Sequence, residues 1–175
     1  MNSKEILADV LERKMENESL DCIKVIDVIR EAGVSKPTFY RYFNDKYELL
    51  EYCFRRIYND TFGRISRYYP FSEACKDVYR LYREKQGFLR CGYLSKDVNG
   101  LTSLEIRLVR ETYSHYLENL GLADKGEVTF SLDLFSTGAV EMTKRWVLDG
   151  MHRSDEEQTR LLIRALPNNI AQYFR

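Results

Sequence analysis

Proline and histidine are both scarce in this chain of 175 residues. The three prolines, Pro37, Pro70 and Pro167, leave long stretches in which helices can run without a break. Aromatic residues make up 13% of the chain and hydrophobic residues 44%, which excludes a disordered protein and is enough to bury a full core. The composition and the apolar spacing together predict an all-α fold of about nine helices.

Groupings of cysteine and histidine are also lacking. The four cysteines form no Cys-x-x-Cys pair, and His115 and His152 lie near none of them in sequence. Zinc sites and catalytic Cys-His pairs depend on such groupings. Cys53 and Cys75 fall on apolar helix faces, where we expect buried thiols that pack as small hydrophobes. We therefore expect no metal, no cofactor, no catalytic residue and no enzymatic activity.

Long uncharged runs and an excess of either charge sign are missing as well. The longest run without Asp, Glu, Lys or Arg is Ala165 to Phe174, too short to span a bilayer, and no signal peptide precedes Ser3. We therefore expect a cytoplasmic protein with no membrane contact. Lys and Arg total 27 and so do Asp and Glu, a balance that argues against binding nucleic acid by bulk attraction alone.

What the sequence does contain is a helix-turn-helix pattern over residues 25–43. Apolar residues at spacings of three and four predict a first helix that ends at Gly33, a residue suited to a left-handed C-cap. Ser35 is a good N-cap for a second helix that buries Phe39 and Phe43. The open face of this second helix carries side chains that can donate hydrogen bonds to base edges or phosphates. They are Lys36, Thr38, Tyr40 and Arg41.

The residues after the pattern predict the start of a further helix. Asp45 and Glu48 form a capping box, which places Lys46 in the first helical turn. A lysine at a helix N-terminus favours an anion such as phosphate. The apolar positions from Leu50 to Ile65 then predict a long fourth helix, while residues 6–15 predict a first helix that braces the motif.

These spacings resemble the N-terminal DNA-binding region of the TetR family of transcriptional regulators. The matching residues are Asp27, Ala32-Gly33-Val34-Ser35, Thr38-Phe39-Tyr40-Arg41-Tyr42-Phe43, Lys46 and Glu48-Leu49-Leu50. The resemblance implies a three-helix DNA-binding head over residues 1–48 and a short, variable helical body over residues 49–175. It places Lys36, Pro37, Thr38, Tyr40 and Arg41 at the major groove of double-stranded DNA, and Lys24, Tyr42 and Lys46 at the phosphates.

Two positions depart from the family pattern. Lys24 stands where a Ser or Thr cap is usual, and Pro37 stands where a small residue is usual, so one backbone donor is lost. Tyr40 and Tyr42 flank a buried phenylalanine, and either of them could simply cover the core. Because of the departures at Lys24 and Pro37, DNA binding is expected to differ in strength from that of a typical member.

The last two predicted helices suggest an interface with a second copy. Apolar residues recur at spacings of three and four along residues 132–146, and Ser154 with Glu157 caps a final helix. The resemblance implies that this pair forms a four-helix dimer interface, and an ordinary core face is the alternative. The candidate interface residues are Phe135, Gly138, Ala139, Met142, Trp146, Leu161, Leu162 and Ala165.

The resemblance also implies a small-molecule effector inside the body. Tyr79, Tyr82 and Tyr113 are the candidate lining residues, and core aromatics are the alternative. The sequence as a whole predicts a homodimeric, sequence-specific transcriptional regulator, with repression controlled by an effector as the leading hypothesis. The alternative is a co-regulator of the same fold that a protein partner controls. An enclosed cavity of ligand size would separate the two.

Overall fold

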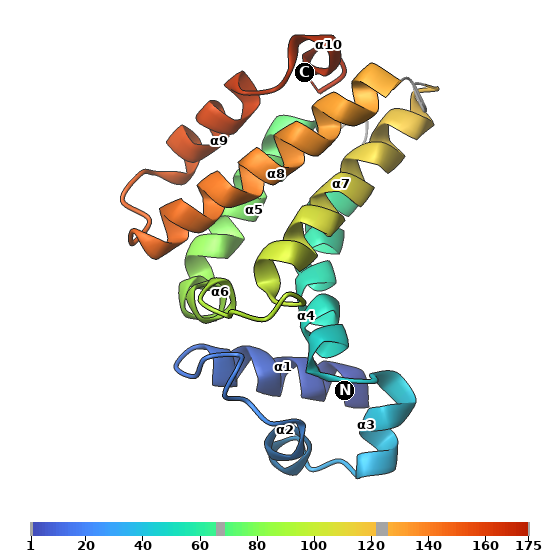
Figure 1. The fold of residues 1–175 in the computed structure, drawn as a ribbon, viewed down its shortest axis with the longest axis vertical. Helices are drawn as coiled ribbons and strands as arrows, with labels where there is room; N and C mark the ends of the chain where they lie inside the picture. The colour runs from blue at the N-terminus through green and yellow to red at the C-terminus, as the bar shows by residue number, and fades with distance from the viewer. Residues whose placement is uncertain (1, 66–68, 122–125, 175) are drawn as a thin grey trace. The chain divides into compact units, whose positions relative to one another are not determined.

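The computed structural model describes residues 2–65, 69–121 and 126–174. These residues form ten α-helices and one short 3-10 helix and contain no β-strand (Figure 1), which confirms the all-α prediction. The chain divides into two compact units, described separately below. Unit 1 comprises Met1–Arg56 and Lys85–Leu104, and unit 2 comprises Ile57–Glu84 and Glu105–Arg175. The expected domain boundary after residue 48 stays a prediction.

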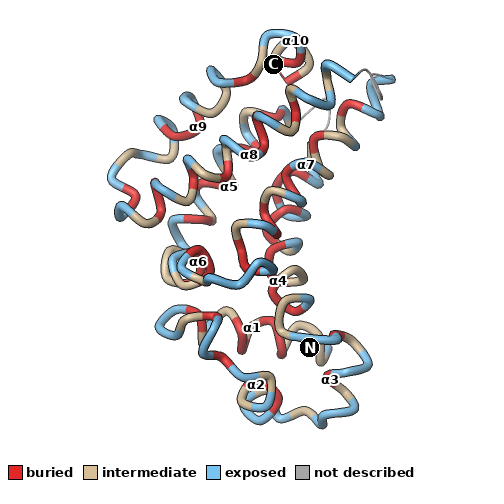
Figure 2. Tube along the Cα trace, in the orientation of Figure 1, coloured by how far each residue is buried: buried red, intermediate tan, exposed pale blue. Residues whose placement is uncertain are grey.

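Unit 1 is built on helix α1. It contains α1 (Ser3–Met15), α2 (Val25–Glu31), α3 (Lys36–Tyr42), most of α4 (Lys46–Asp60), α6 (Gln86–Tyr93) and the start of α7 (Leu101–Asn119). The buried residues of α1 include Leu7, Leu11 and Met15, as a bracing helix requires. Figure 2 colours the buried residues along α1 red. Helix α6 packs closely on the end of α1 at Gly87. A Cβ atom added to this glycine would lie only 3.0 Å from the carbonyl oxygen of Glu16.

Helix α4 is shorter than expected. It ends at Asp60, and a 3-10 helix follows over Phe62–Arg64, so Ile65 does not continue the apolar stripe of α4. Thr61 marks the break: its backbone has φ −122° and ψ −86°, and its buried hydroxyl donates to the carbonyl of Ile57 at 2.7 Å. A side-chain bond to the preceding turn competes with continuation of the helix. The prediction of one helix from Leu50 to Ile65 was therefore wrong at its end.

Unit 2 has an aromatic core. It contains α5 (Phe71–Glu84), the rest of α7, α8 (Gly126–Leu148), α9 (Asp155–Arg164) and α10 (Asn168–Ala171). The rings of Phe71, Tyr113 and Phe174 are all buried, and the centroids of Phe71 and Phe174 lie 4.7 Å apart in an edge-to-face arrangement. Helices α5 and α9 pack together, whereas α8 and α9 run in opposite directions (Figure 1).

The turn between α8 and α9 is held by one arginine. Arg83 of α5 donates to the carbonyls of Met151 at 3.0 Å and Arg153 at 2.7 Å, and to the carboxylate of Asp155 at 2.8 Å. Met151 has a positive φ of 55°, which is uncommon for a side chain of this size. Ser154 then accepts a bond from the backbone of Glu157 at 3.2 Å, as the predicted cap requires.

The remaining compositional expectations concern thiols, metals and membranes. Cys53 and Cys75 are both buried, as predicted, and burial raises the pKa of each thiol. Within residues 2–65, 69–121 and 126–174, no three His, Cys, Asp or Glu side chains come together as a metal site would require. None of the helices in that part of the chain combines the length and the hydropathy of a bilayer-spanning segment.

Candidate nucleic-acid interface

The turn between α2 and α3 has the geometry that its residues predict. Gly33 has φ +65°, in the left-handed region, and the amide of Val34 donates to the carbonyl of Ile29 at 3.3 Å. Ser35 then caps α3 by accepting a bond from the backbone of Thr38 at 3.2 Å. These bonds satisfy groups that helix ends leave open, so the crossing of the two helices is set by local chemistry.

Helix α3 separates a buried face from an open one. Phe39 and Phe43 are fully or nearly fully buried, whereas Tyr40 is 57% exposed and Lys36, Pro37 and Arg41 are exposed. The seven residues of α3 include no acidic side chain. Its open face is therefore cationic and can approach an anionic duplex without a repulsive carboxylate of its own.

Two of the residues expected at the major groove, Thr38 and Arg41, take part in hydrogen bonds within the chain. The hydroxyls of Thr38 and Ser35 lie 2.9 Å apart, so Thr38 supports the cap and keeps part of its bonding capacity. Arg41 donates to the hydroxyl of Tyr42 at 3.1 Å, and its guanidinium carbon lies 4.8 Å from the centre of that ring. The arginine is thus held by a stacked ring beside the open face of α3.

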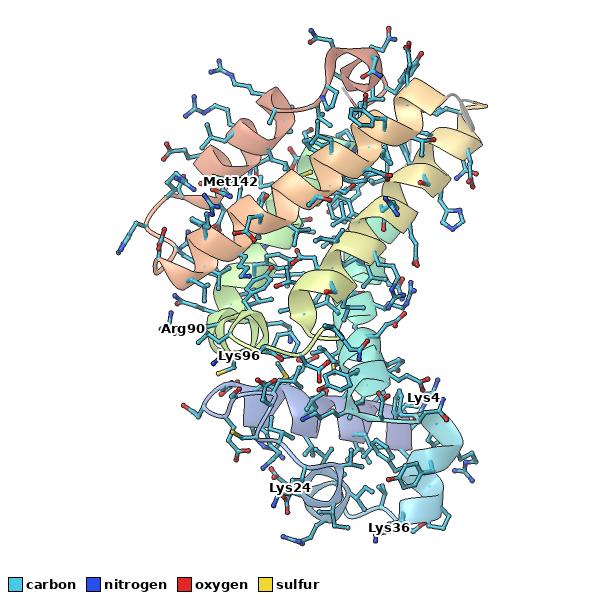
Figure 3. All side chains as sticks on the ribbon, in the orientation of Figure 1. Lys4, Lys24, Lys36, Arg90, Lys96 and Met142 are labelled. Atoms are coloured by element: carbon cyan, nitrogen blue, oxygen red, sulfur yellow. The ribbon has the colours of Figure 1, made fainter. Side chains whose placement is uncertain are left out.

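Lys24 lies at the N-cap position of α2 and is exposed. Its side chain makes no capping bond, as expected for a lysine in place of Ser or Thr. Figure 3 labels Lys24 at the start of α2 and Lys36 at the start of α3. The assignment of both lysines to DNA stays a prediction.

Lys46 lies where the capping box predicts, but its side chain has another role. Its ammonium group donates to the carbonyls of Leu20 at 2.7 Å, Ile23 at 3.1 Å and Asp21 at 3.3 Å. An ammonium has three donors, so these three bonds engage the whole group inside unit 1. Lys46 therefore joins the start of α4 to the segment between α1 and α2, and its expected phosphate contact stays a prediction.

The cap that places Lys46 is present, with one difference. Asp45 accepts bonds from the backbones of Tyr47 at 2.8 Å and Glu48 at 2.9 Å. Glu48 reaches back one residue further than expected and accepts from the backbone of Asn44 at 2.8 Å. This bond, together with one from the Asn44 side chain, lowers the pKa of Glu48.

A second set of bonds joins the segment after α6 to this region within unit 1. The carboxylate of Asp21 accepts from the hydroxyl of Ser95 and from the backbone of Lys96, which lowers the pKa of Asp21. Tyr47 donates to Asp97 at 2.6 Å, and burial raises the pKa of Tyr47 to about 12. Partners some fifty to seventy-five residues apart carry no local sequence signal, and the sequence did not reveal them.

Sequence reasoning also missed Lys4, in the first turn of α1. Its ammonium lies 5.7 Å from the ring centre of Tyr42 and 5.2 Å from that of Tyr52. The amphipathic pattern of the first helix marks Lys4 only as a solvent-facing position. Its proximity to the end of α3 is a result of tertiary packing.

The candidate dimer residues fall into two groups in unit 2. An apolar groove of about 500 Å³ lies between α8 and α9 (Figure 3 labels Met142, one of its lining residues). Seven of the eight candidates line it: Phe135, Gly138, Ala139, Met142, Leu161, Leu162 and Ala165. Trp146 does not line the groove. It is 2% exposed and packs against Tyr79, with 5.5 Å between the ring centroids.

Phe135 and Trp146 thus contribute mainly to the core of unit 2 in a single chain. Phe135 is also buried, and its ring stacks on that of Tyr113 at 5.9 Å. Two exposed residues that the periodicity did not select, Phe130 and Leu134, lie about two turns and one turn before Gly138 on α8. Because α8 is apolar on several faces, spacing alone could not tell its core face from its open face.

The three candidate pocket tyrosines do lie together. Tyr79, Tyr82 and Tyr113 line a cavity of about 30 Å³ with the buried carboxylate of Glu105. Tyr82 donates to Glu105 at 2.7 Å, and the hydroxyl of Tyr79 lies 3.3 Å from that of Thr143. Such a volume holds about one or two water molecules, whereas ligand pockets are typically about 300 to 1,000 Å³.

Comparison with known proteins agrees with a helix-turn-helix in the N-terminal part of the chain. Residues 22–53 match the family model described as "Bacterial regulatory proteins, tetR family". A stretch of 86 residues is 27% identical to the HTH-type dhaKLM operon transcriptional activator DhaS of Lactococcus lactis subsp. lactis (strain IL1403). That stretch is 49% of this chain and 46% of the relative, so the match spans about half the length of each protein.

Two solved structures show the same fold over almost all of the chain. The dihydroxyacetone kinase operon activator DhaS superposes with a TM-score of 0.67 at 18% identity and covers 99% of this chain and 98% of its own. A tetR-family transcriptional regulator from Streptomyces coelicolor has a TM-score of 0.54 at 19% identity, covering 94% of this chain and 80% of its own. At these identities the likeness concerns the fold.

Proposed function

We propose that this chain is a DNA-binding transcriptional regulator with a helix-turn-helix of the TetR type, and that it reads a specific operator as a homodimer. The observation that carries this proposal is the open face of α3. Tyr40 and Lys36 are exposed there, Arg41 is positioned by Tyr42, and no carboxylate interrupts the helix. Arginine, lysine and hydroxyl side chains at the start of a recognition helix are the groups that contact base edges and phosphates.

Selection from a pool of random duplexes tests the DNA-reading role. The wild-type protein is expected to enrich one sequence, and Tyr40→Ala and Arg41→Ala are expected to lose that enrichment. Lys96→Ala is the matched control, because this side chain is exposed in unit 1 but lies on the segment after α6. Enrichment of no sequence by the wild-type protein would overturn the proposal.

The homodimer is supported by exposed apolar side chains on α8 and α9. Leu134 is 65% exposed and Met142 is 50% exposed, and Leu161 and Ala165 are exposed beside them on α9. Contiguous apolar surface of this kind usually marks an interaction site. A second copy is the occupant we favour, because a two-fold dimer carries two recognition helices and can read two successive major grooves, which lie about 34 to 36 Å apart.

The mass of the protein in solution tests the dimer. Leu134→Glu and Met142→Glu each place a charge on the groove side of α8 and are expected to convert a dimer into a monomer, as measured by light scattering after size exclusion. Thr129→Glu is the control, since this exposed residue lies on the same helix outside the groove. A wild-type monomer at micromolar concentration, or a dimer unaffected by either substitution, would contradict the proposed interface.

The alternative in which a protein partner controls the regulator is favoured by the cavity at Tyr79, Tyr82 and Tyr113. Its volume of about 30 Å³ is far below that of an effector site. Val109→Leu adds one methylene to this cavity and tests the point. If a small molecule acts there, the substitution abolishes the response of a reporter gene in the native host. If a protein partner acts, or a ligand in the groove of about 500 Å³ between α8 and α9, the response persists.

The sign of regulation needs its own test. Repression was the expectation from the family resemblance, whereas the relative from Lactococcus lactis is described as a transcriptional activator. We favour activation on that ground. A reporter gene behind the selected operator gives higher expression with an activator and lower expression with a repressor. Because operator DNA is the proposed partner, we expect a cytoplasmic location.

A further inference from the structure

Lys4 and Arg41 are two cations that share one aromatic ring. The ammonium of Lys4 lies 5.7 Å from the ring centre of Tyr42, and the guanidinium carbon of Arg41 lies 4.8 Å from it. Among the residues that the structure describes, neither cation has a carboxylate within ion-pair distance. Both cations lie within cation–π distance of the Tyr42 ring, and each attracts an anion that comes near the ring.

The hydroxyl of Tyr42 adds a further donor to this pair. Its oxygen accepts a hydrogen bond from Arg41 at 3.1 Å, so its own hydrogen is left to donate. The ring of Tyr42 thus has an ammonium, a guanidinium and its own hydroxyl around it, and each of these groups can donate to a phosphate oxygen. Acidic residues nearby are engaged elsewhere: Glu5 accepts a bond from Tyr52 and pairs with Arg56.

The cluster lies at the end of the proposed reading surface. Tyr42 is the last residue of α3, whereas Lys36 is the first. Figure 3 shows Lys4 on α1, on the other side of the head from Lys24 at the start of α2. Lys4 is held there by three rings, since its ammonium also lies 5.8 Å from the ring centre of Phe43 and 5.2 Å from that of Tyr52. Cation–π contacts of this kind restrain a long side chain that would otherwise be mobile.

We infer that Lys4, Arg41 and Tyr42 bind one phosphate of the DNA backbone, at the C-terminal end of α3. This inference rests on the proposed function and adds Lys4 of α1 to the contact surface. The contact is to the backbone, so it fixes the position of the head on the duplex and carries no sequence information itself.

Fluorescence anisotropy over a salt series tests this inference with the selected duplex and a scrambled duplex. Lys4→Met keeps the aliphatic packing against the rings and removes the charge. It is expected to reduce the slope of log K against log salt by about one unit and to weaken binding to both duplexes by the same factor. Lys4→Arg is expected to restore the slope. Lys96→Met is the matched control, an exposed lysine of unit 1 away from the cluster, and is expected to match the wild type.

Tyr42→Phe provides an independent check, since it removes only the hydroxyl. It is expected to weaken binding to both duplexes while keeping the ratio of the two affinities. If Lys4→Met binds the selected duplex with the wild-type slope, the phosphate site is refuted and the DNA-reading role stands. If the wild-type protein prefers neither duplex, the proposed function fails first, and the phosphate site fails with it.

Discussion

Removing the ammonium of Lys46 is expected to destabilise the protein without changing how its DNA binding depends on salt. Lys46→Met keeps the aliphatic stem and deletes the three bonds to the carbonyls of Leu20, Asp21 and Ile23. The segment between α1 and α2 would then lose its attachment to the start of α4. A phosphate contact would show the opposite behaviour, because it acts only when DNA is present.

The magnitude follows from the three bonds. The bonds to Leu20 at 2.7 Å and Ile23 at 3.1 Å are partly buried, whereas the bond to Asp21 is longer, at 3.3 Å, and exposed. A bond to a charged group contributes about 1.5 to 3 kcal/mol, and water replaces the exposed one at little cost. Ordering a lysine side chain offsets up to about 2 kcal/mol of the two remaining bonds. We expect a net loss of about 2 kcal/mol.

Urea unfolding followed by circular dichroism measures this loss, and hydrogen exchange at residues 20–28 locates it. Lys24→Met is the paired variant, because Lys24 is exposed and its side chain makes no capping bond. We expect Lys24→Met to change stability by less than about 0.5 kcal/mol and to reduce the salt slope of DNA binding by about one unit. If Lys46→Met instead reduces the salt slope and leaves stability unchanged, the structural role of Lys46 is wrong.

Three further outcomes follow from the same contacts. Gly87→Ala is expected to lower the free energy of unfolding, measured in urea, by about 1 kcal/mol. The added methyl group meets the backbone of Glu16, and the resulting strain exceeds the gain in helix propensity. Equal or greater stability would mean that α6 is free to shift. The carboxylate of Asp21 has a lowered pKa, so its contribution to stability is present above its ordinary pKa of 3.8 and is lost as the pH falls through the lower folded value. Asp21→Asn should therefore destabilise the protein at pH 7 and make little difference near pH 2 (about two units below the ordinary value), and a constant difference across that range would contradict the assignment. Arg83→Met should lower the stability of unit 2 by about 2 kcal/mol in thermal unfolding, since the carbonyls of Met151 and Arg153 lose their donor. An unchanged melting temperature would show that the turn between α8 and α9 is stable without these bonds.

Local chemistry made the helix-turn-helix predictable. The predicted turn and caps depend only on neighbours within a few positions. The structure contains each of them: the positive φ at Gly33 and the caps at Ser35, Asp45 and Ser154. The exposed face of α3 is predictable for the same reason. Phe39 is buried, and its position next to Tyr40 on the helix leaves Tyr40 exposed.

Long-range packing decided the points that the sequence did not reveal. The carbonyls that hold Lys46 are more than twenty residues away, and the cations beside Tyr42 come from different helices. Periodicity placed Trp146 on an interface, but its contact with Tyr79 of α5 buries it in the core. Likewise, the three tyrosines lie together as expected, but the cavity that they line has a volume of only about 30 Å³.

The most direct test of the central claim is the ratio of affinities for the selected duplex and a scrambled duplex, measured by fluorescence anisotropy for the wild type and Tyr40→Ala. The account predicts a ratio of about 10³ or more for the wild type at physiological salt, and a fall of about tenfold or more for Tyr40→Ala with little change in binding to the scrambled duplex. A wild-type ratio near one, or a ratio that Tyr40→Ala leaves unchanged, would contradict the claim that the open face of α3 reads DNA.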